Sequence, residues 1–303
     1  MGLIRPGASG AGALAALVGA LGVVALASVS APAAPDRVQV SPLRGVRSWA
    51  VYYGDDLAAA SRLARFDLVV LDPGRHPPLD AVKRHGALVL MYVSLGELNV
   101  AHPAHAALGG APWVLDANPN WPDARRLDVR DPGWQRWLLE TVVPAALTGP
   151  VNGLFLDTAD TALNMEMVEP GRFAGMATAL EQALSRLRER HPRALLVLNG
   201  GLPWAERVAP LLDGIALESI ATDYDFGTKA YRTRDEASAI ARAAGLRRLA
   251  DRVPALLTIE YADPLDAAGA ARAAAASRAQ GFVPYVTTIG LDRAPAEVRP
   301  ATR

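Results

Sequence analysis

Gly153-Leu154-Phe155-Leu156-Asp157-Thr158-Ala159-Asp160 is the stretch that decides the fold: an apolar run that stops on one carboxylate and sets a second three residues later. Parallel strands that are buried on both faces read as continuous apolar runs, and ligands gather at the carboxyl ends of such strands. A strand that ends in Asp157 therefore predicts a functional site at that end.

The same pattern of a short apolar run bounded by Gly, Pro or charge recurs along the chain. Together with the first stretch it gives eight candidate strands, at Val46 to Tyr53, Phe66 to Asp72, Ala87 to Glu97, Val151 to Asp157, Ala194 to Asn199, Gly214 to Glu218, Ala255 to Tyr261 and Phe282 to Thr287.

Segments with helical spacing separate most of these runs, at Asp55 to Arg65, Pro132 to Leu147, Arg172 to Arg190, Pro203 to Leu212, Arg234 to Ala250 and Pro264 to Gln280. Alternation of strand and helix predicts right-handed crossovers and a parallel sheet. Eight such units in about 250 residues is the size of a (β/α)8 TIM barrel, so we expect an α/β protein with one barrel domain. A doubly wound open sheet is the alternative.

Composition limits the class of protein. The 303 residues are 51% hydrophobic, which supports a large core, and the formal net charge is +0. A nucleic-acid binder normally shows a basic excess or stripe, so we expect no nucleic-acid partner.

The N-terminus has the layout of a secretory signal. Arg5 precedes an apolar stretch from Ala11 to Val29, and small residues and Pro follow as far as Pro35. We expect residues 1–34 to be a signal peptide or membrane anchor, 35–45 a linker and 46–303 the barrel. The protein is then secreted, periplasmic or part of the cell envelope, and it meets a membrane only through this segment if the segment stays uncleaved.

The longest gap between predicted elements runs from Asn99 to Asp131 and carries Trp113 and Trp121. A loop this long in a compact barrel is usually functional. We expect it to contribute to the site.

Polar and aromatic residues stand at or just beyond the end of each predicted strand. They are Tyr52, Tyr53, Asp72, Glu97, Asp157, Asp160, Asn199, Glu218, Glu260, Tyr261, Asp263 and Tyr285. In a barrel all of them converge on one mouth, which would be acidic and ringed with aromatics. Two opposed carboxylates are what glycosidic hydrolysis requires, and aromatic rings offer flat apolar faces to sugars.

Each of these residues also has a structural interpretation. Asp72 before Pro73-Gly74 suits a turn, Asn199 before Gly200-Gly201 suits a loop, and Asp160 suits a helix cap. Glu97 could bind a backbone amide or an arginine. The strongest candidates for chemistry are Asp157 and Glu218, because an uncompensated charge at the end of a buried strand is costly.

Other catalytic patterns fail. His102 and His105 lack the third ligand of a zinc site, and neither a phosphate-binding Gly-x-x-x-x-Gly-Lys loop nor a Cys nucleophile is present. We therefore expect no cofactor and no metal. A cation held by carboxylates alone, in a metal-assisted hydrolase, stays open as a minor alternative.

Six motifs, taken together and in order, resemble glycoside hydrolase family 114, the endo-α-1,4-polygalactosaminidase family, which is related to the hydrolase domain of the Pel polysaccharide protein. The motifs are Tyr92 to Glu97, Asp128 to Trp134, Gly153 to Asp160, Leu198 to Gly201, Glu218-Ser219 and Gly281 to Tyr285. The resemblance covers nearly all of the chain after residue 45.

The resemblance implies a TIM barrel whose catalytic pair ends the fourth and sixth strands, at Asp157 and Glu218. It implies endo-acting cleavage of an α-1,4-linked, galactosamine-containing exopolysaccharide, with Asp157 as nucleophile and Glu218 as general acid/base, or the reverse. We expect a monomer that binds a cationic polymer through residues at the mouth, namely Tyr52, Asp72, Glu97, Asp160, Asn199, Glu260, Tyr261 and Tyr285. A barrel that binds carbohydrate without turnover is the alternative.

Overall fold

The computed structural model describes residues 41–119, 121–202 and 204–293. The predicted leader and residues 35–40 of the predicted linker lie outside these ranges. Residues 41–45 are described, and they hold the 3-10 helix η1 (Pro42–Gly45), whose Leu43 is buried in the core. Within the described ranges, no helix is long and apolar enough to cross a membrane.

Eight parallel strands form one sheet, in the order β1-β2-β3-β7-β8-β9-β12-β13. They are β1 (Trp49–Tyr52), β2 (Leu68–Leu71), β3 (Leu88–Ser94), β7 (Gly153–Asp157), β8 (Leu195–Asn199), β9 (Gly214–Glu218), β12 (Ala255–Tyr261) and β13 (Val283–Thr287). All eight predicted strands are confirmed.

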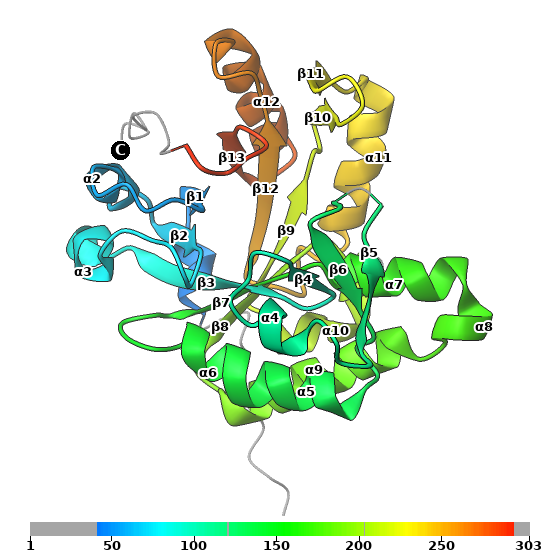
Figure 1. The fold of residues 1–303 in the computed structure, drawn as a ribbon. Coiled ribbons are helices and arrows are strands. Elements are labelled where there is room, and N and C mark those ends of the chain that lie inside the picture. Colours follow the sequence, from blue (N-terminus) through cyan, green and yellow to red (C-terminus); the bar gives the residue numbers. More distant parts are fainter. Residues whose placement is uncertain (1–40, 120, 203, 294–303) are drawn as a thin grey trace, which may run out of the picture. The chain divides into compact units, whose positions relative to one another are not determined.

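The two edge strands meet, so the sheet is a nearly closed (β/α)8 barrel (Figure 1). The Trp49 indole on β1 donates a hydrogen bond of 2.9 Å to the Val283 carbonyl on β13. Rings fill the inside: Trp49 lies 6.2 Å from Phe155 and 6.1 Å from Tyr285, measured between ring centroids. The interior of the barrel is therefore a packed core, as is usual for this fold.

Helices surround the strands (Figure 1). They are α2 (Ala59–Leu63), α3 (Leu79–Val82), α5 (Pro132–Trp137), α6 (Val143–Ala146), α7 (Ala159–Val168), α8 (Pro170–Phe173), α9 (Met176–Arg190), α10 (Ala205–Val208), α11 (Glu236–Arg247) and α12 (Ala267–Ala279). Short 3-10 turns follow α3 and α10, at Lys83–His85 and Ala209–Leu211.

Local sequence explains where several helices begin and how they pack. Asp131, Asp235 and Asp266 cap α5, α11 and α12 by accepting hydrogen bonds from backbone amides, as this residue type prefers. On α9 the side chains of Leu180 and Leu187 are fully buried, and each such leucine contributes roughly 1.5–3 kcal/mol.

One predicted helix contains an irregular turn. Between α5 and α6 the residues Leu138–Val142 form a π-helical turn just before Pro144. Proline has no amide hydrogen and its ring crowds the preceding turn, so a local widening of the helix is expected there.

Two insertions add small antiparallel sheets beyond the carboxyl ends of the strands. The first follows β3 and holds β4 (Glu97–Asn99), the short helix α4 (His105–Leu108), β5 (Val114–Ala117) and β6 (Ala124–Leu127). The second follows β9 and is a hairpin of β10 (Thr222–Asp225) and β11 (Ala230–Thr233). The sequence predicted a loop from Asn99 to Asp131, whereas the structure forms a three-stranded sheet in the order β4-β6-β5.

The other end of the barrel holds a buried ion pair. Arg188 on α9 lies 2.7 Å from the carboxylate of Asp213, which precedes β9, and both side chains are buried. Arg188 also donates to the carbonyls of Leu211 and Ala194, at 2.6 Å each, and Asp213 accepts from the Leu196 amide at 3.0 Å. This pair ties α9 to two strands.

Candidate active site

A single amide joins the two strongest candidate carboxylates. Asn199 Nδ2, at the end of β8, donates to Asp157 Oδ1 at 2.9 Å and to Glu218 Oε1 at 2.8 Å. Asp157 ends β7 and Glu218 ends β9, so the three residues come from three consecutive strands of the sheet. Asn199 is buried, while both acids are half-buried.

Tyrosine hydroxyls supply further donors to the pair. Tyr261 at the end of β12 donates to Glu218 Oε2 at 2.7 Å, and Tyr92 on β3 donates to Asp157. Tyr53 packs edge-on against Tyr92 with ring centroids 5.2 Å apart. Burial raises the pKa of the Tyr53 phenol, and the charges of Asp157 and Glu218 raise it further.

Burial raises the pKa of both acids, but their surroundings differ. For Asp157 the hydrogen bonds from Asn199, the Thr158 backbone and Tyr92 oppose that rise in pKa. At Glu218 the negative charges of Asp157 and Asp160 raise the pKa further, against the hydrogen bonds from Tyr261 and Asn199. Neighbouring negative charge thus adds to the rise in pKa at Glu218, whereas the other neighbours of Asp157 oppose the rise there.

The chain turns sharply after each of these strands. Thr158 and Ser219, which follow the two acids, adopt left-handed φ values of 61° and 58°, and Gly200 after Asn199 has φ of 69°. For a β-branched residue such as Thr158 this conformation is strained, and strain of this kind is retained where the surroundings fix it.

Hydrogen bonds hold Thr158 in that conformation. Its hydroxyl accepts from the amides of Leu95 and Gly96 at 3.1 and 2.8 Å, and lies 2.7 Å from the Ser94 hydroxyl. It also donates to the Asp157 carbonyl at 2.7 Å. A Cβ at Gly96 would collide with the Thr158 carbonyl, so only glycine fits there. The turn after β3 therefore fixes the residue that follows Asp157.

Two more acids stand beside the pair. Asp160 lies in the first turn of α7, and desolvation together with the charges of Asp157 and Glu97 raises its pKa to about 6. Glu97 on β4 is buried and accepts from Asn118 Nδ2 and Thr161 Oγ1, both at 2.5 Å. Glu97 thus links the first insertion to α7.

Glu260 lies apart from this group. It is fully buried on β12 and accepts from the Ala221 amide, the Thr222 amide and hydroxyl, and Ser277 of α12. Side chains alternate between the two faces of a strand, so Glu260 faces the helices while Tyr261 faces the barrel interior. The sequence placed Glu260 among the substrate-binding residues at the mouth, but its side chain is buried on the other face of β12. There it holds the second insertion against the barrel.

Three other predicted mouth residues also have structural partners. Tyr52 is buried on the face of β1 opposite to Tyr53, and its hydroxyl accepts from the Asp56 amide at 3.3 Å. Tyr285 is buried among Trp49 and Phe66, and burial raises its pKa to about 12. The Asp72 carboxylate accepts a hydrogen bond from the Gly74 amide at 2.7 Å, as expected for the turn that Asp72-Pro73-Gly74 suggests.

Tyr53 and Tyr92, which border the acids, were not among the predicted substrate-binding residues, although Tyr53 was among the residues noted at the strand ends. Tyr92 lies in the Tyr92 to Glu97 motif, two residues before Ser94, which pairs in register with Asp157. Residues two apart on a strand share a face, so that spacing was the signal. In the part of the chain that the structure describes, no group of three or more His, Cys, Asp or Glu side chains could hold a metal ion.

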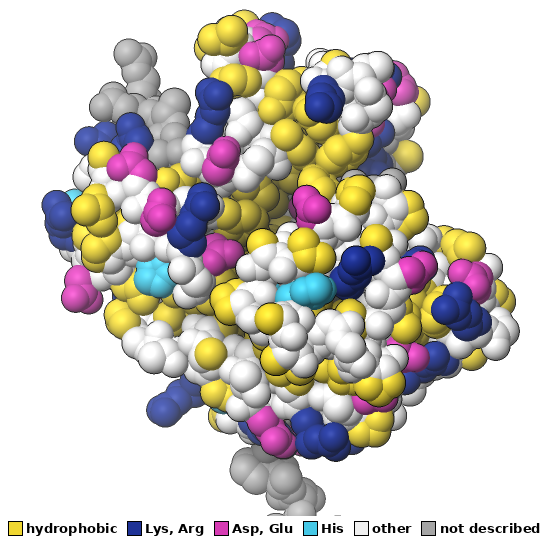
Figure 2. Space-filling model, in the orientation of Figure 1, with side chains coloured by type: hydrophobic (Ala, Val, Ile, Leu, Met, Phe, Trp, Pro, Cys, Tyr) yellow, Lys and Arg dark blue, Asp and Glu magenta, His cyan; other side chains and the backbone are white. Residues whose placement is uncertain are grey.

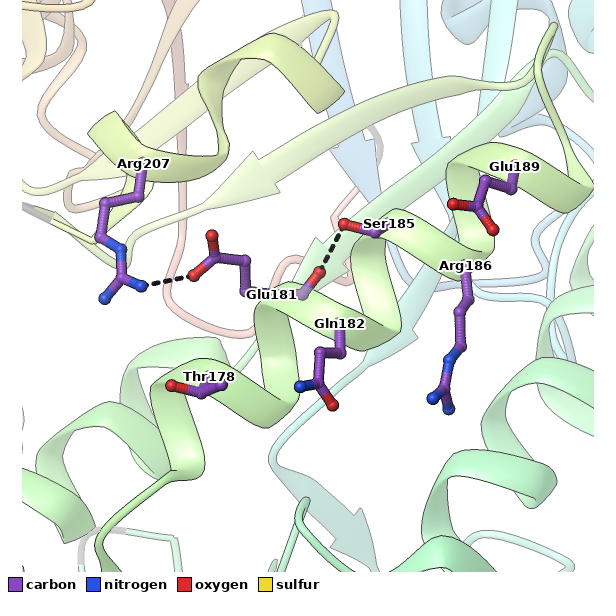
Figure 3. Close-up of a pocket in the computed structure, with 7 residues that line it drawn as sticks. All are labelled: Thr178, Glu181, Gln182, Ser185, Arg186, Glu189 and Arg207. Atoms are coloured by element: carbon purple, nitrogen blue, oxygen red, sulfur yellow. Dashed lines mark hydrogen bonds and ion pairs between the residues drawn. The ribbon is translucent and has the colours of Figure 1, made fainter. Parts of the chain in front are cut away.

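A separate surface depression lies on the outer side of α9, away from the strand ends (Figure 3). Arg207 of α10 lies 2.6 Å from Glu181 there, and the Ser185 hydroxyl donates to the Glu181 carbonyl. These are exposed helix-surface contacts, and we assign no chemistry to them.

Paired acids at the carboxyl ends of barrel strands, held by an amide and by phenols, are the arrangement of a glycoside hydrolase. The comparisons with known proteins agree. The chain belongs to glycoside-hydrolase family GH114, whose model matches residues 28–300.

Among solved structures, the glycoside hydrolase domain of PelA from Pseudomonas aeruginosa superimposes with a TM-score of 0.72 at 27% identity, covering 84% of this chain and 99% of that one. Aspergillus fumigatus Ega3, solved in complex with galactosamine, shares the fold with a TM-score of 0.59 at 14% identity, covering 82% and 93%. An uncharacterised protein of Deinococcus radiodurans is 26% identical over 264 residues, 83% of each chain. The predicted family, fold and enzyme class are thereby confirmed.

Proposed function

We propose that this glycoside hydrolase cleaves α-1,4-linked, galactosamine-containing polysaccharide at internal positions, with Asp157 and Glu218 as the catalytic pair. The observation that carries the proposal is the contact of one Asn199 nitrogen with both acids, at 2.9 and 2.8 Å. Because one donor holds both carboxyl groups, they lie close enough together to contact the same glycosidic bond.

The shared donor also supports a retaining mechanism. The two contacted oxygens can be no farther apart than these two hydrogen bonds laid end to end, which is less than the roughly 6.5 Å at which inverting enzymes begin. A pair this close leaves no room for a water between acid and sugar. Direct attack by one carboxylate fits the spacing.

The pKa directions support the assignment of roles. Glu218, whose pKa is raised by burial and by neighbouring negative charge, donates its proton to the leaving glycosidic oxygen while ionised Asp157 attacks the anomeric carbon. A covalent glycosyl-enzyme forms and the leaving sugar departs. Glu218, now ionised, then takes a proton from water, which displaces Asp157 and restores both groups.

Charge around the pair supports a cationic substrate. Deacetylated galactosamine carries an ammonium group, and Asp160 and Glu97 add negative charge beside Asp157. Carboxylates of one sign in a cleft concentrate counter-charged substrate. Ega3, which shares this fold, was solved with galactosamine, and that sugar suits this mouth.

We also propose the location and organisation of the chain. Residues 1–34 act as a signal peptide or membrane anchor, as their sequence predicts, and 46–303 form the hydrolase domain. The enzyme then works outside the cytoplasm, where an exopolysaccharide is found. It acts as a monomer.

The test is an incubation of the enzyme with acetylated and deacetylated galactosamine polymers, read out by new reducing ends and by product mass. We expect internal fragments from the deacetylated polymer, and none from a variant that carries both Asp157→Asn and Glu218→Gln. Binding of polymer without any new reducing end, at high enzyme concentration, contradicts the proposal and selects a binding protein.

A further inference from the structure

Four aromatic side chains from the two insertions gather into what we call the aromatic cluster: Trp121, Tyr224, Phe226 and Tyr231. Trp121 lies between β5 and β6, and the other three belong to the β10–β11 hairpin. Ring centroids are 4.9 Å apart for Trp121 and Phe226, 5.1 Å for Tyr224 and Phe226, and 5.0 Å for Tyr224 and Tyr231. Segments about a hundred residues apart in sequence thus meet through these rings.

The two outer rings of the cluster remain open to solvent. Trp121 and Phe226 are each 49% exposed, although they are among the largest apolar side chains of the chain. Their planes meet at 80°, so the edge of one ring contacts the other and ring faces stay uncovered. Clustered exposed aromatics mark a binding surface more often than scattered apolar residues do.

The first insertion fixes Trp121 relative to the acids. The Trp121 amide donates to the Asn118 carbonyl at 3.2 Å, and the Asn118 side chain donates to Glu97 at 2.5 Å. Glu97 in turn raises the pKa of Asp160 through its charge. Movement of Trp121 is therefore limited by a residue that stands beside the site.

The second insertion is fixed from the other side. Thr222 at the start of β10 binds buried Glu260, and its hydroxyl accepts from the Tyr261 amide at 2.8 Å. The hydroxyl of Tyr261 contacts Glu218. The Ile289 amide also donates to the Tyr231 hydroxyl at 3.2 Å, which ties the hairpin to the segment after β13.

Both insertions follow strands that carry residues of the site, β3 and β9, and in Figure 1 the β10–β11 hairpin lies above β5 and β6. Figure 2 shows hydrophobic side chains, in yellow, in the middle of this face with acidic side chains, in magenta, beside them. The contact between Trp121 and Phe226 therefore joins the two insertions that begin at the carboxyl ends of β3 and β9.

Resting on the proposed function, we infer that the aromatic cluster is a sugar subsite that holds a galactosamine unit of the polymer some distance from the bond that is cut. The ring faces of Trp121 and Phe226 match the apolar face of a sugar, and an ammonium group near the indole gains cation–π attraction. Because hydrogen bonds fix both insertions before substrate arrives, binding there orders little of the protein. A remote subsite of this kind favours internal over terminal cleavage.

The test compares long galactosamine polymer with oligosaccharides of a few units that reach only the acids. For the variant Trp121→Ala with Phe226→Ala, we expect kcat/KM on the polymer to fall about tenfold more than kcat/KM on the oligosaccharides. Trp121→Phe keeps a ring face and should recover most of the polymer activity. An equal loss on both substrates, or no loss on either, overturns the inference.

Leu265→Ala is the matched control, because Leu265 is 93% exposed on another loop beyond the strand ends and makes no part of the cluster. It should leave the ratio of the two kcat/KM values unchanged. Quenching of Trp121 fluorescence by the polymer, as the difference between the wild type and Trp121→Phe, measures binding without turnover. If the wild type cuts no polymer, the proposed function fails, and fluorescence quenching alone tests the subsite. Absence of quenching would then overturn the proposed subsite.

Discussion

The two ends of the barrel treat buried charge in opposite ways. At the amino end of the strands Arg188 and Asp213 form a buried pair at 2.7 Å, and carbonyl and amide groups complete their hydrogen bonds. At the carboxyl end Asp157 and Glu218 share one amide donor, and burial raises the pKa of both. In the first arrangement each charge has an opposite charge and hydrogen-bond partners, so removal of one partner is costly, whereas the second holds two like charges together at a cost in stability.

The largest expected effect is at the carboxyl end. Asp157→Asn and Glu218→Gln should each lower kcat on galactosamine polymer by about a thousandfold or more, because each removes a group that reacts directly. Reducing-end assays measure the loss. A residual rate within tenfold of the wild type for both variants would contradict the assignment.

The same two substitutions should not destabilise the protein. A folded-state pKa above the unfolded value means that these acids contribute stability at low pH and lose it as pH rises through the folded pKa. The thermal stability of the neutral variants relative to the wild type should therefore increase as the pH rises from 4 to 8. Melting temperatures of the variants and the wild type at pH 4 and pH 8 check the sign. A loss of stability in the variants, relative to the wild type, that grows with rising pH would contradict this expectation.

The amino end should show the reverse. Arg188→Met removes the guanidinium that lies 2.7 Å from buried Asp213, and we expect a loss of about 3–5 kcal/mol in the free energy of unfolding. Arg207→Met is the control, because Arg207 pairs with Glu181 at 2.6 Å on the exposed surface shown in Figure 3, where a pair contributes about 1 kcal/mol or less. Urea denaturation measures both, and similar losses for the two variants would argue against a special role for the buried pair.

A further variant tests how Asp157 is positioned. Gly96→Ala places a methyl group against the Thr158 carbonyl, which must shift the residue that follows Asp157. We expect kcat to fall by about a hundredfold with little change in KM, since the geometry of the reacting groups changes. Gly110→Ala meets no atom within 4 Å and is the control. Equal kcat values for the two variants would mean that the turn does not position the acid.

The smallest expected effect concerns pH. Asp160, with a pKa of about 6, raises the pKa of Glu218 through its charge. Asp160→Asn should lower the pKa of Glu218 and so move the alkaline limb of kcat/KM to lower pH by a fraction of a unit. A pH profile of both proteins measures the shift, and a move to higher pH would contradict the proposed role of Glu218 as the acid.

The sequence predicted the barrel because its strands are apolar on both faces. Gly214–Glu218 and Ala255–Tyr261 match the predicted runs residue for residue. The insertions were missed because their strands are only three or four residues long, and β10 reads Thr-Asp-Tyr-Asp, which carries no apolar signal. Antiparallel pairing across a chain segment, rather than local pattern, makes these sheets.

For the site, the sequence indicated which strand ends matter better than which side chain faces the barrel. Tyr52 and Tyr53 both stand at the end of β1, yet the pKa of Tyr53 responds to the acids while Tyr52 is buried on the other face. A shift of one residue reverses the face of a strand, and strand ends do not fix that choice. The same ambiguity separates Glu260 from Tyr261.

The central claim is that Asp157 and Glu218, held by one amide, react as the close pair of a retaining hydrolase. Proton nuclear magnetic resonance of the first product released from an α-linked galactosamine polymer tests it most directly, through the configuration of the new reducing end. We expect the α-anomer to appear first and then to mutarotate. Initial release of the β-anomer would contradict it, because inversion needs a water between the two carboxylates.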